Sequence, residues 1–122
     1  MPKIIIAEDH EVLMDSLRQM ILEEFPTASI ETVSDTNALL ERVLNDHWDL
    51  VISDLSMPGG GGFFALRKIK LEKKDLPVII TSTYPAEQYA DRVIRAGAAE
   101  YISKDSLSTS LITAIRRIIQ PG

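Results

Sequence analysis

The chain has no cysteine and only two histidines, which removes several classes of site at once. Without thiols it forms neither disulfides nor thiolate metal sites. No apolar run approaches the roughly 18 residues that a membrane-spanning helix needs. The first residues lead directly into an apolar strand pattern rather than a signal peptide, so the cytoplasm is the expected compartment. The net charge of −5 disfavours direct binding of this chain to nucleic acid.

With 122 residues, 45% of them hydrophobic and 25% charged, the chain is expected to form one globular domain around one core. Short apolar runs alternate with helical periodicities along its length. The predicted strands are 4–7, 30–33, 50–53, 78–80 and 100–103. A helical pattern follows each strand. The first helix ends at 25–26, and Asp35 is the predicted N-cap of the second. The last three cover 63–72, 86–96 and 107–119, and Gly97 is predicted to end the fourth. Five such alternations predict an α/β fold, a flavodoxin-like (βα)5 doubly wound sandwich with a parallel sheet of strand order 2-1-3-4-5.

Carboxylates follow two of these strands. Asp54 comes directly after the central strand and before Met57–Pro58, and Glu8 and Asp9 follow the first strand. In the predicted order these two strands are neighbours, so the three carboxylates meet at the carboxyl edge of the sheet, where such folds bind ligands. Three negative charges so close together need a compensating cation. Mg²⁺ suits an all-oxygen site of this kind.

A wider set of residues carries a resemblance to a known family. Glu8–Asp9, Asp54 with Met57–Pro58–Gly59, Ser82 after the fourth strand, and Ala96–Gly97–Ala98 leading to Tyr101 and Lys104 resemble the receiver domain of two-component response regulators. The ending 101–105, with Asp105 where many receivers have proline, is most similar to the transcription-regulating subgroup with a LuxR-type helix-turn-helix domain. By this resemblance residues 1–119 are the receiver, and 120–122 begin a linker or mark a boundary of the expressed segment.

The resemblance implies a role for each residue of the acidic site. Asp54 is the expected acceptor of a phosphoryl group from a sensor histidine kinase. Mg²⁺ is expected to bind Asp54, Asp9, the backbone carbonyl of Ser56, and Glu8 through water, while Lys104 neutralises the carboxylate and then the phosphate. Independently of the family, transfer between two anionic groups requires such cationic charge. The domain is expected to be regulatory rather than an enzyme, catalysing only its own phosphorylation and slow dephosphorylation.

The resemblance also implies how the signal leaves the site. Ser82 and Tyr101 form the expected switch, and the fourth helix, fifth strand and fifth helix the output surface. The expected partners are a second copy of the domain and a DNA-binding domain beyond this chain. The two copies are expected to pair either through that output surface or through the first and fifth helices. From composition alone, any hydroxyl of Thr81–Ser82–Thr83 could serve as a turn or cap residue. Only the resemblance selects Ser82.

Two other functions remain open from the sequence. One is a receiver-like interaction module that is never phosphorylated. The other is an aspartyl-phosphate hydrolase of the haloacid dehalogenase type, which needs a second Asp two residues after the nucleophile, where this chain has Ser56.

Some remaining residues have only structural interpretations. The four consecutive glycines at 59–62 are not a P-loop, because no Lys-Ser or Lys-Thr follows them, and are expected to form a loose, mobile turn. His10 and His47 are expected to be surface residues without a partner at metal spacing. Phe63 and Phe64 are consecutive, so a helix cannot bury both, and one is a candidate partner contact.

Overall fold

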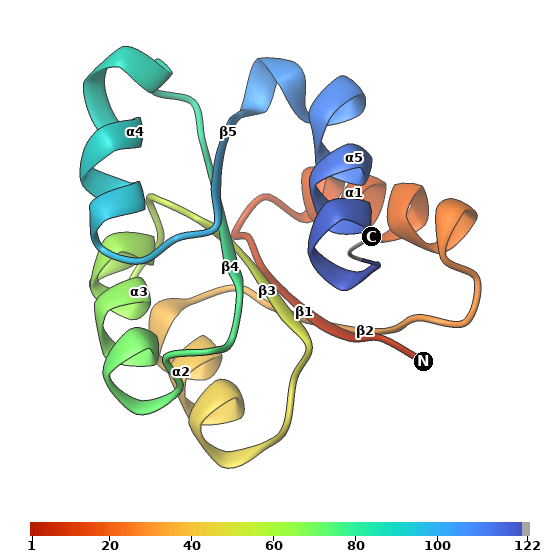
Figure 1. The fold of residues 1–122 in the computed structure, drawn as a ribbon, viewed down its shortest axis with the longest axis horizontal. Coiled ribbons are helices and arrows are strands. Elements are labelled where there is room, and N and C mark those ends of the chain that lie inside the picture. Colours follow the sequence, from red (N-terminus) through yellow and green to blue (C-terminus); the bar gives the residue numbers. More distant parts are fainter. Residues whose placement is uncertain (121–122) are drawn as a thin grey trace.

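A computed structural model describes residues 1–120 as five parallel strands and the helices between them (Figure 1). The strands are β1 (Lys3–Ala7), β2 (Ser29–Val33), β3 (Leu50–Asp54), β4 (Val78–Ser82) and β5 (Glu100–Ser103). The helices are α1 (Glu11–Glu24), α2 (Thr36–Asn45), α3 (Gly61–Glu72), α4 (Ala86–Arg95) and α5 (Leu107–Ile119), with a 3₁₀ turn, η1 (Lys104–Ser106), before α5. The sheet order β2-β1-β3-β4-β5 confirms the predicted fold class and topology. The expected linker start at 120–122 lies, apart from Gln120, outside the described residues.

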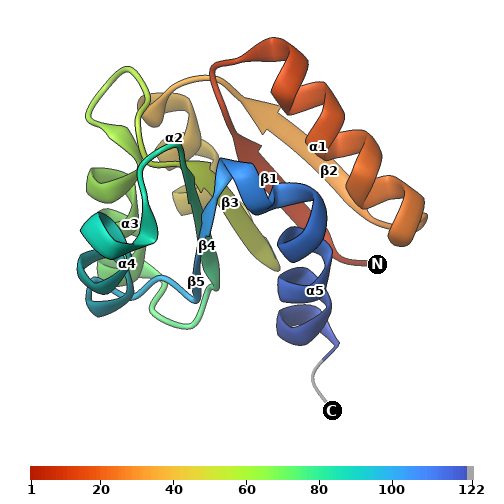
Figure 2. The same ribbon diagram turned by 90° about the horizontal axis from the view of Figure 1, so that it is seen from above.

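Helices cover both faces of the sheet. Helices α1 and α5 lie on one face, and α2, α3 and α4 lie on the other (Figures 1 and 2). Each face therefore has its own apolar cluster, one centred on Ile4, Ile6 and Leu111 and the other on Ile5, Val51 and Leu66. All five residues of β3 and of β4 are buried, which is why each sequence begins with three consecutive apolar residues before its polar end.

Two predicted helix ends are confirmed. The Asp35 side chain accepts a hydrogen bond of 2.8 Å from the N–H of Ala38 and so caps α2. Gly97 has φ +113°, the left-handed conformation that ends α4. Helix α3 begins at Gly61, two residues before the expected start.

The four glycines at 59–62 lead into α3. The prediction of a loose turn was wrong for Gly61 and Gly62, which are buried in the first turn of the helix. The N–H of Gly61 donates a hydrogen bond of 2.9 Å to the Thr36 hydroxyl on α2. A Cβ on Gly62 would overlap the carbonyl oxygen of Asp54, so only glycine fits directly behind that residue. Residues 59–60 are exposed, and the expected mobility is now limited to them. The turn thereby connects the end of β3 to two neighbouring helices.

Replacing Thr36 tests this connection. Thr36→Val should lower the free energy of unfolding by about 1–3 kcal/mol, because the buried N–H of Gly61 loses its acceptor. Thr36→Ser keeps the hydroxyl and should retain most of that free energy. Urea denaturation, with amide exchange of Gly61, measures both effects. Equal losses in the two variants would show that the hydrogen bond does not hold the turn.

Candidate functional site

Three strands bring a charged group to the carboxyl edge of the sheet. Glu8 follows β1, Asp54 ends β3, and Lys104 follows β5 at the start of η1. Glu8 and Asp54 are buried, with 1% and 4% of their surfaces exposed. The Lys104 ammonium lies 3.0 Å from Glu8 Oε1 and 3.2 Å from Asp54 Oδ2. The N–H of Ser56 donates to Asp54 Oδ1 at 3.3 Å. A single ammonium thus lies between two buried carboxylates and leaves negative charge in excess.

The surroundings move the pKa values of the two carboxylates in opposite directions. Burial raises the pKa of Asp54 above its usual value, the charge of Glu8 adds to this, and Lys104 only partly offsets it. Burial also acts to raise the pKa of Glu8, but the hydrogen bonds from His10 and the nearby charge of Lys104 outweigh it and leave that pKa lowered. The two carboxylates in turn outweigh burial at Lys104 and raise its pKa. Glu8 is therefore the stabilised anion, and Asp54 is the carboxylate whose charge is least compensated.

The donor set fits a divalent cation. One ligand atom from each of Glu8, Asp9, His10 and Asp54 lies within 4.8 Å of the others. Glu8 Oε1 is buried and makes no hydrogen bond, although the Lys104 ammonium is close enough for an ion pair. A buried oxygen without a hydrogen-bond donor is costly unless a cation or water completes its contacts. A hard cation with oxygen ligands, such as Mg²⁺, meets this need.

His10 corrects one prediction. Its side chain is 73% exposed, as expected for a surface residue. However, its Nδ1 lies 3.0 Å from Glu8 Oε2 and 3.4 Å from Asp9 Oδ1, so it does have neighbours at the distance of a metal site. The sequence could not show this, because the contact depends on the Glu8 side chain turning back to the backbone N–H of His10, at 3.0 Å. His47 is exposed, as expected.

The two expected switch residues are connected through a residue that the sequence did not indicate. Ser82 is buried at the end of β4, and its Oγ accepts a hydrogen bond of 2.9 Å from the N–H of Tyr84. The Tyr101 hydroxyl donates a hydrogen bond of 2.7 Å to the carbonyl oxygen of the same Tyr84. No hydrogen bond joins Ser82 to Asp54 in the described part of the chain. The only sequence signal for Tyr84 was an aromatic side chain in a short polar loop.

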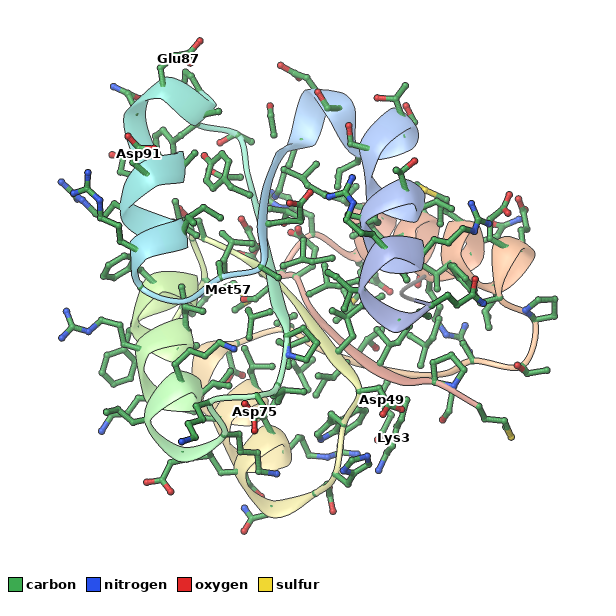
Figure 3. All side chains as sticks on the ribbon, in the orientation of Figure 1. Lys3, Asp49, Met57, Asp75, Glu87 and Asp91 are labelled. Atoms are coloured by element: carbon green, nitrogen blue, oxygen red, sulfur yellow. The ribbon has the colours of Figure 1, made fainter. Side chains whose placement is uncertain are left out.

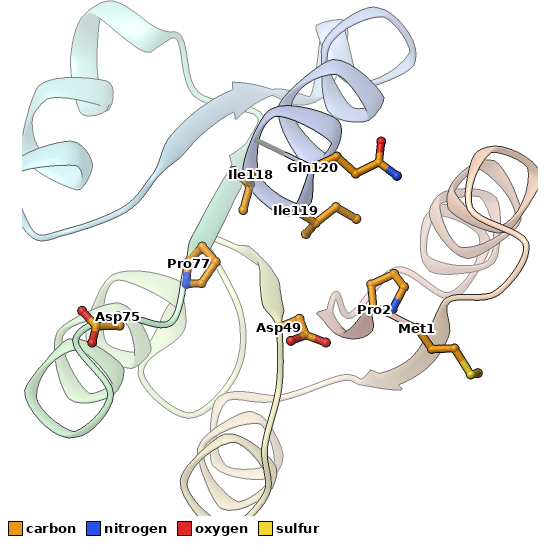
Figure 4. Close-up of a pocket in the computed structure, with 8 residues that line it drawn as sticks. All are labelled: Met1, Pro2, Asp49, Asp75, Pro77, Ile118, Ile119 and Gln120. Atoms are coloured by element: carbon orange, nitrogen blue, oxygen red, sulfur yellow. The ribbon is translucent and has the colours of Figure 1, made fainter. Parts of the chain in front are cut away.

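A separate hollow lies at the other end of the sheet. Figure 4 shows it near the start of β3 and the end of α5, whereas Asp54 lies at the carboxyl end of β3. Its lining consists of Met1, Pro2, Asp49, Asp75, Pro77, Ile118, Ile119 and Gln120. None of the acidic-site residues contributes to it, so the hollow is not part of the candidate site.

Comparison with known families identifies this arrangement. Residues 4–116 match the response regulator receiver domain. The chain belongs to this family. It is 33% identical over 119 residues to the oxygen regulatory protein NreC of Staphylococcus epidermidis, covering 97% of this chain and 55% of the relative. It is 31% identical to the response regulator UvrY of Escherichia coli, covering 97% of this chain and 54% of UvrY. The receiver thus spans about half the length of these curated relatives.

Solved structures agree with the family and its subgroup. The receiver superposes with a TM-score of 0.88 on a LuxR-family response regulator from Aurantimonas, at 26% identity, over 97% of this chain and 84% of that one. It superposes with a TM-score of 0.87 on TrrA of Thermotoga maritima in complex with Mg²⁺ and BeF, also at 26% identity, over 98% of this chain and 100% of that one. These likenesses support the LuxR-type subgroup, and the domain is a regulatory, phosphorylation-based signalling switch. Within residues 1–120, no helix is long and apolar enough to cross a membrane.

The raised pKa of Asp54 predicts how stability depends on pH. Because folding raises this pKa, the ionised carboxylate opposes folding, and the wild type loses stability as the pH rises through that value. Asp54→Asn cannot ionise. Without divalent cations it should be more stable than the wild type at pH 7, and the difference should shrink toward pH 4. Urea denaturation across this range measures it, and Asp15→Asn on exposed α1 is the control. A difference independent of pH would contradict the charge argument.

Proposed function

We propose that Asp54 accepts a phosphoryl group from the phosphohistidine of a sensor histidine kinase in a Mg²⁺-dependent reaction. The observation that carries this proposal is the pair of buried carboxylates around one ammonium, with Glu8 Oε1 lacking a hydrogen bond. In most buried sites such charges are fully paired. Here the negative charge is in excess, as a site that receives a metal ion and a phosphoryl group requires.

The residues that would hold Mg²⁺ are Asp9, Asp54, the backbone carbonyl of Ser56, and Glu8 through a water molecule. The bound ion would neutralise charge on the transferred phosphoryl group. Asp9 is the most exposed carboxylate of the group and the easiest for an entering cation to reach. The Mg²⁺–BeF complex of the related TrrA supports this assignment at the level of the family.

The transfer itself requires positioning and charge compensation. An oxygen of Asp54 forms a bond to phosphorus as the bond from phosphorus to the imidazole nitrogen of the kinase breaks. The electron pair of that bond stays on the imidazole nitrogen, and a proton on the other ring nitrogen of the phosphohistidine makes the leaving group a neutral imidazole. Lys104, already 3.2 Å from Asp54, then pairs with a phosphoryl oxygen. Slow attack by water on the phosphorus breaks its bond to the Asp54 carboxylate, releases inorganic phosphate and returns the domain to its starting state.

The hydrogen bonds around Tyr84 support a mechanism for the switch. A phosphoryl group on Asp54 adds about 1.5–2 negative charges and three strong acceptor oxygens. The Ser82 hydroxyl turns to donate to one of them and weakens its bond with the N–H of Tyr84. The loop between β4 and α4 then moves, and the Tyr101 hydroxyl loses its partner on Tyr84. The surface formed by α4, β5 and α5 changes as a result.

The role of the whole protein is part of the proposal. The relatives are about twice as long as this chain, which fits a helix-turn-helix DNA-binding domain following the receiver. We infer that phosphorylation controls that domain, through α4, β5 and α5 or through pairing of two receivers. With a histidine kinase as the proposed donor, we infer that the domain acts in the cytoplasm.

Intact mass spectrometry tests the acceptor. Incubation with acetyl phosphate and Mg²⁺ should add one phosphoryl group to the wild type and none to Asp54→Asn. Omitting Mg²⁺ should abolish the adduct. Asp105→Asn is the matched control, because Asp105 is an exposed carboxylate beside Lys104 and should leave the adduct unchanged.

The outcome also decides between the two kinds of module. If no adduct forms and beryllofluoride with Mg²⁺ changes no amide chemical shift near Asp54, the domain is an interaction module that is never phosphorylated. An adduct that persists in Asp54→Asn would place the acceptor elsewhere.

Replacing single hydroxyls tests the switch. Ser82→Ala should still accept the phosphoryl group, but the shift changes that beryllofluoride causes at Tyr84 and Tyr101 should be largely lost. Thr83→Ala removes a neighbouring exposed hydroxyl and should keep them. NMR of the two labelled variants measures this directly. Equal responses would show that Ser82 is not the sensing hydroxyl.

A further inference from the structure

Helix α3 presents two large apolar side chains to solvent. It buries Ala65, Leu66 and Ile69 against the sheet. Phe64 is 44% exposed and Leu71 is 81% exposed. These two residues are seven positions apart, so they lie on one stripe of the helix, facing away from the core. Phe63 packs against the core, so Phe64 is the one of the consecutive pair that is available to a partner.

Basic side chains surround this stripe. Helices α3 and α4 lie on the same face of the sheet (Figures 1 and 2). A hollow of about 460 Å³ lies between them, lined by Phe63, Arg67, Lys70, Leu71, Arg92, Arg95 and Ala96. A second hollow continues along α3 and is lined by Gly60, Phe63, Phe64, Arg67, Lys68 and Leu71. We call Phe64, Arg67, Lys68, Leu71, Arg92 and Arg95 the α3–α4 surface. Neither lining includes a carboxylate.

The charges of this surface are not neutralised within the domain. Elsewhere, Arg42, Arg116 and Arg117 each form an ion pair with a carboxylate. Over residues 1–120, the arginines of the α3–α4 surface form none. The acidic residues of α4, Glu87 and Asp91, are labelled in Figure 3 and do not line either hollow. The domain has a net charge of −5, so an uncompensated basic surface on it stands out.

We propose that the α3–α4 surface binds an acidic amphipathic segment of a partner protein. Apolar side chains of that segment cover Phe64 and Leu71, and its carboxylates meet the arginines. Aromatic residues and arginine are the residue types that dominate binding energy at protein interfaces. Opposite charge steers the partner to the surface and fixes its orientation. A nucleic acid would satisfy the arginines but would leave the apolar stripe uncovered, since its backbone is charged throughout.

The α3–α4 surface lies apart from the phosphorylation site at Asp54. The surface shares no residue with the acidic site or with Ser82, Tyr84 and Tyr101. Its test therefore uses the unphosphorylated domain, and its failure leaves the acceptor assignment untouched.

A synthetic peptide serves as the probe. It is helical, with glutamates on one face and leucine and tryptophan seven positions apart on the other. A peptide of the same composition in scrambled order is the control. Titration of the isotope-labelled domain should shift amides of residues 60–71 and 92–96, and little else, with weaker binding as salt increases. The scrambled peptide should bind at least about tenfold more weakly.

Matched pairs of variants locate the contact. Arg95→Glu should weaken binding about tenfold. Arg18→Glu makes the same charge change at an exposed arginine of α1 that forms no ion pair within residues 1–120, and it should leave binding within about twofold. Leu71→Ala should weaken binding several-fold. Val12→Ala is its control, since Val12 on α1 is also 81% exposed.

Three results would overturn the proposal. The first is equal effects of Arg95→Glu and Arg18→Glu. The second is tight binding of a mixed-sequence DNA duplex at these amides together with no binding of the peptide. The third is self-association of the domain, measured by sedimentation, together with no binding of the peptide. If Arg95→Glu abolished that self-association, a second copy of the domain would be the occupant of the surface.

Discussion

The burial of Glu8 and Asp54 beside a single ammonium is the constraint on which this receiver depends. Two carboxylates removed from water cost more than Lys104 returns, and the raised pKa of Asp54 records the difference. The protein cannot relieve this by separating the two groups, because adjacent parallel strands fix where each one ends. A bound cation would therefore stabilise the site by compensating the excess negative charge of the two carboxylates. A site whose charges were already balanced would bind a metal ion more weakly, and without that ion phosphoryl transfer would be less favourable.

The parts around the site differ in how firmly they are held. Behind Asp54, the Thr36 hydroxyl and the close packing at Gly62 fix the turn into α3. On the β4 side, the loop depends on two hydrogen bonds to Tyr84, and one of them ends on the hydroxyl that is proposed to sense the phosphoryl group. A change at Asp54 therefore moves the loop before α4 more readily than the turn before α3.

Most of the fold was readable from the sequence because buried parallel strands and amphipathic helices leave strong periodic signals. The meeting of Glu8 with Asp54 followed from topology alone. The contacts of His10, the role of Tyr84 and the packed glycine turn did not follow, because each depends on where one side chain or one loop dihedral points. The selection of Ser82 among three hydroxyls rested on resemblance, since its neighbours Thr81 and Thr83 have the same chemistry. Sequence patterns thus located the site but not the hydrogen bonds that connect it to the surface.

The α3–α4 surface joins one firmly held helix to one loosely held helix. Helix α3 buries five of its residues and is anchored at Gly61, whereas α4 buries only Val93 and follows the loop that contains Tyr84. If phosphorylation displaces that loop, α4 moves relative to α3 and the distance of Arg92 and Arg95 from Arg67 changes. A segment bound across both helices then prefers one position of α4. Because coupling between two sites is reciprocal, such a partner would also shift the phosphorylation equilibrium at Asp54. Movement of α4 would thus couple the two sites in both directions: phosphorylation at Asp54 would change partner binding, and partner binding would change phosphorylation.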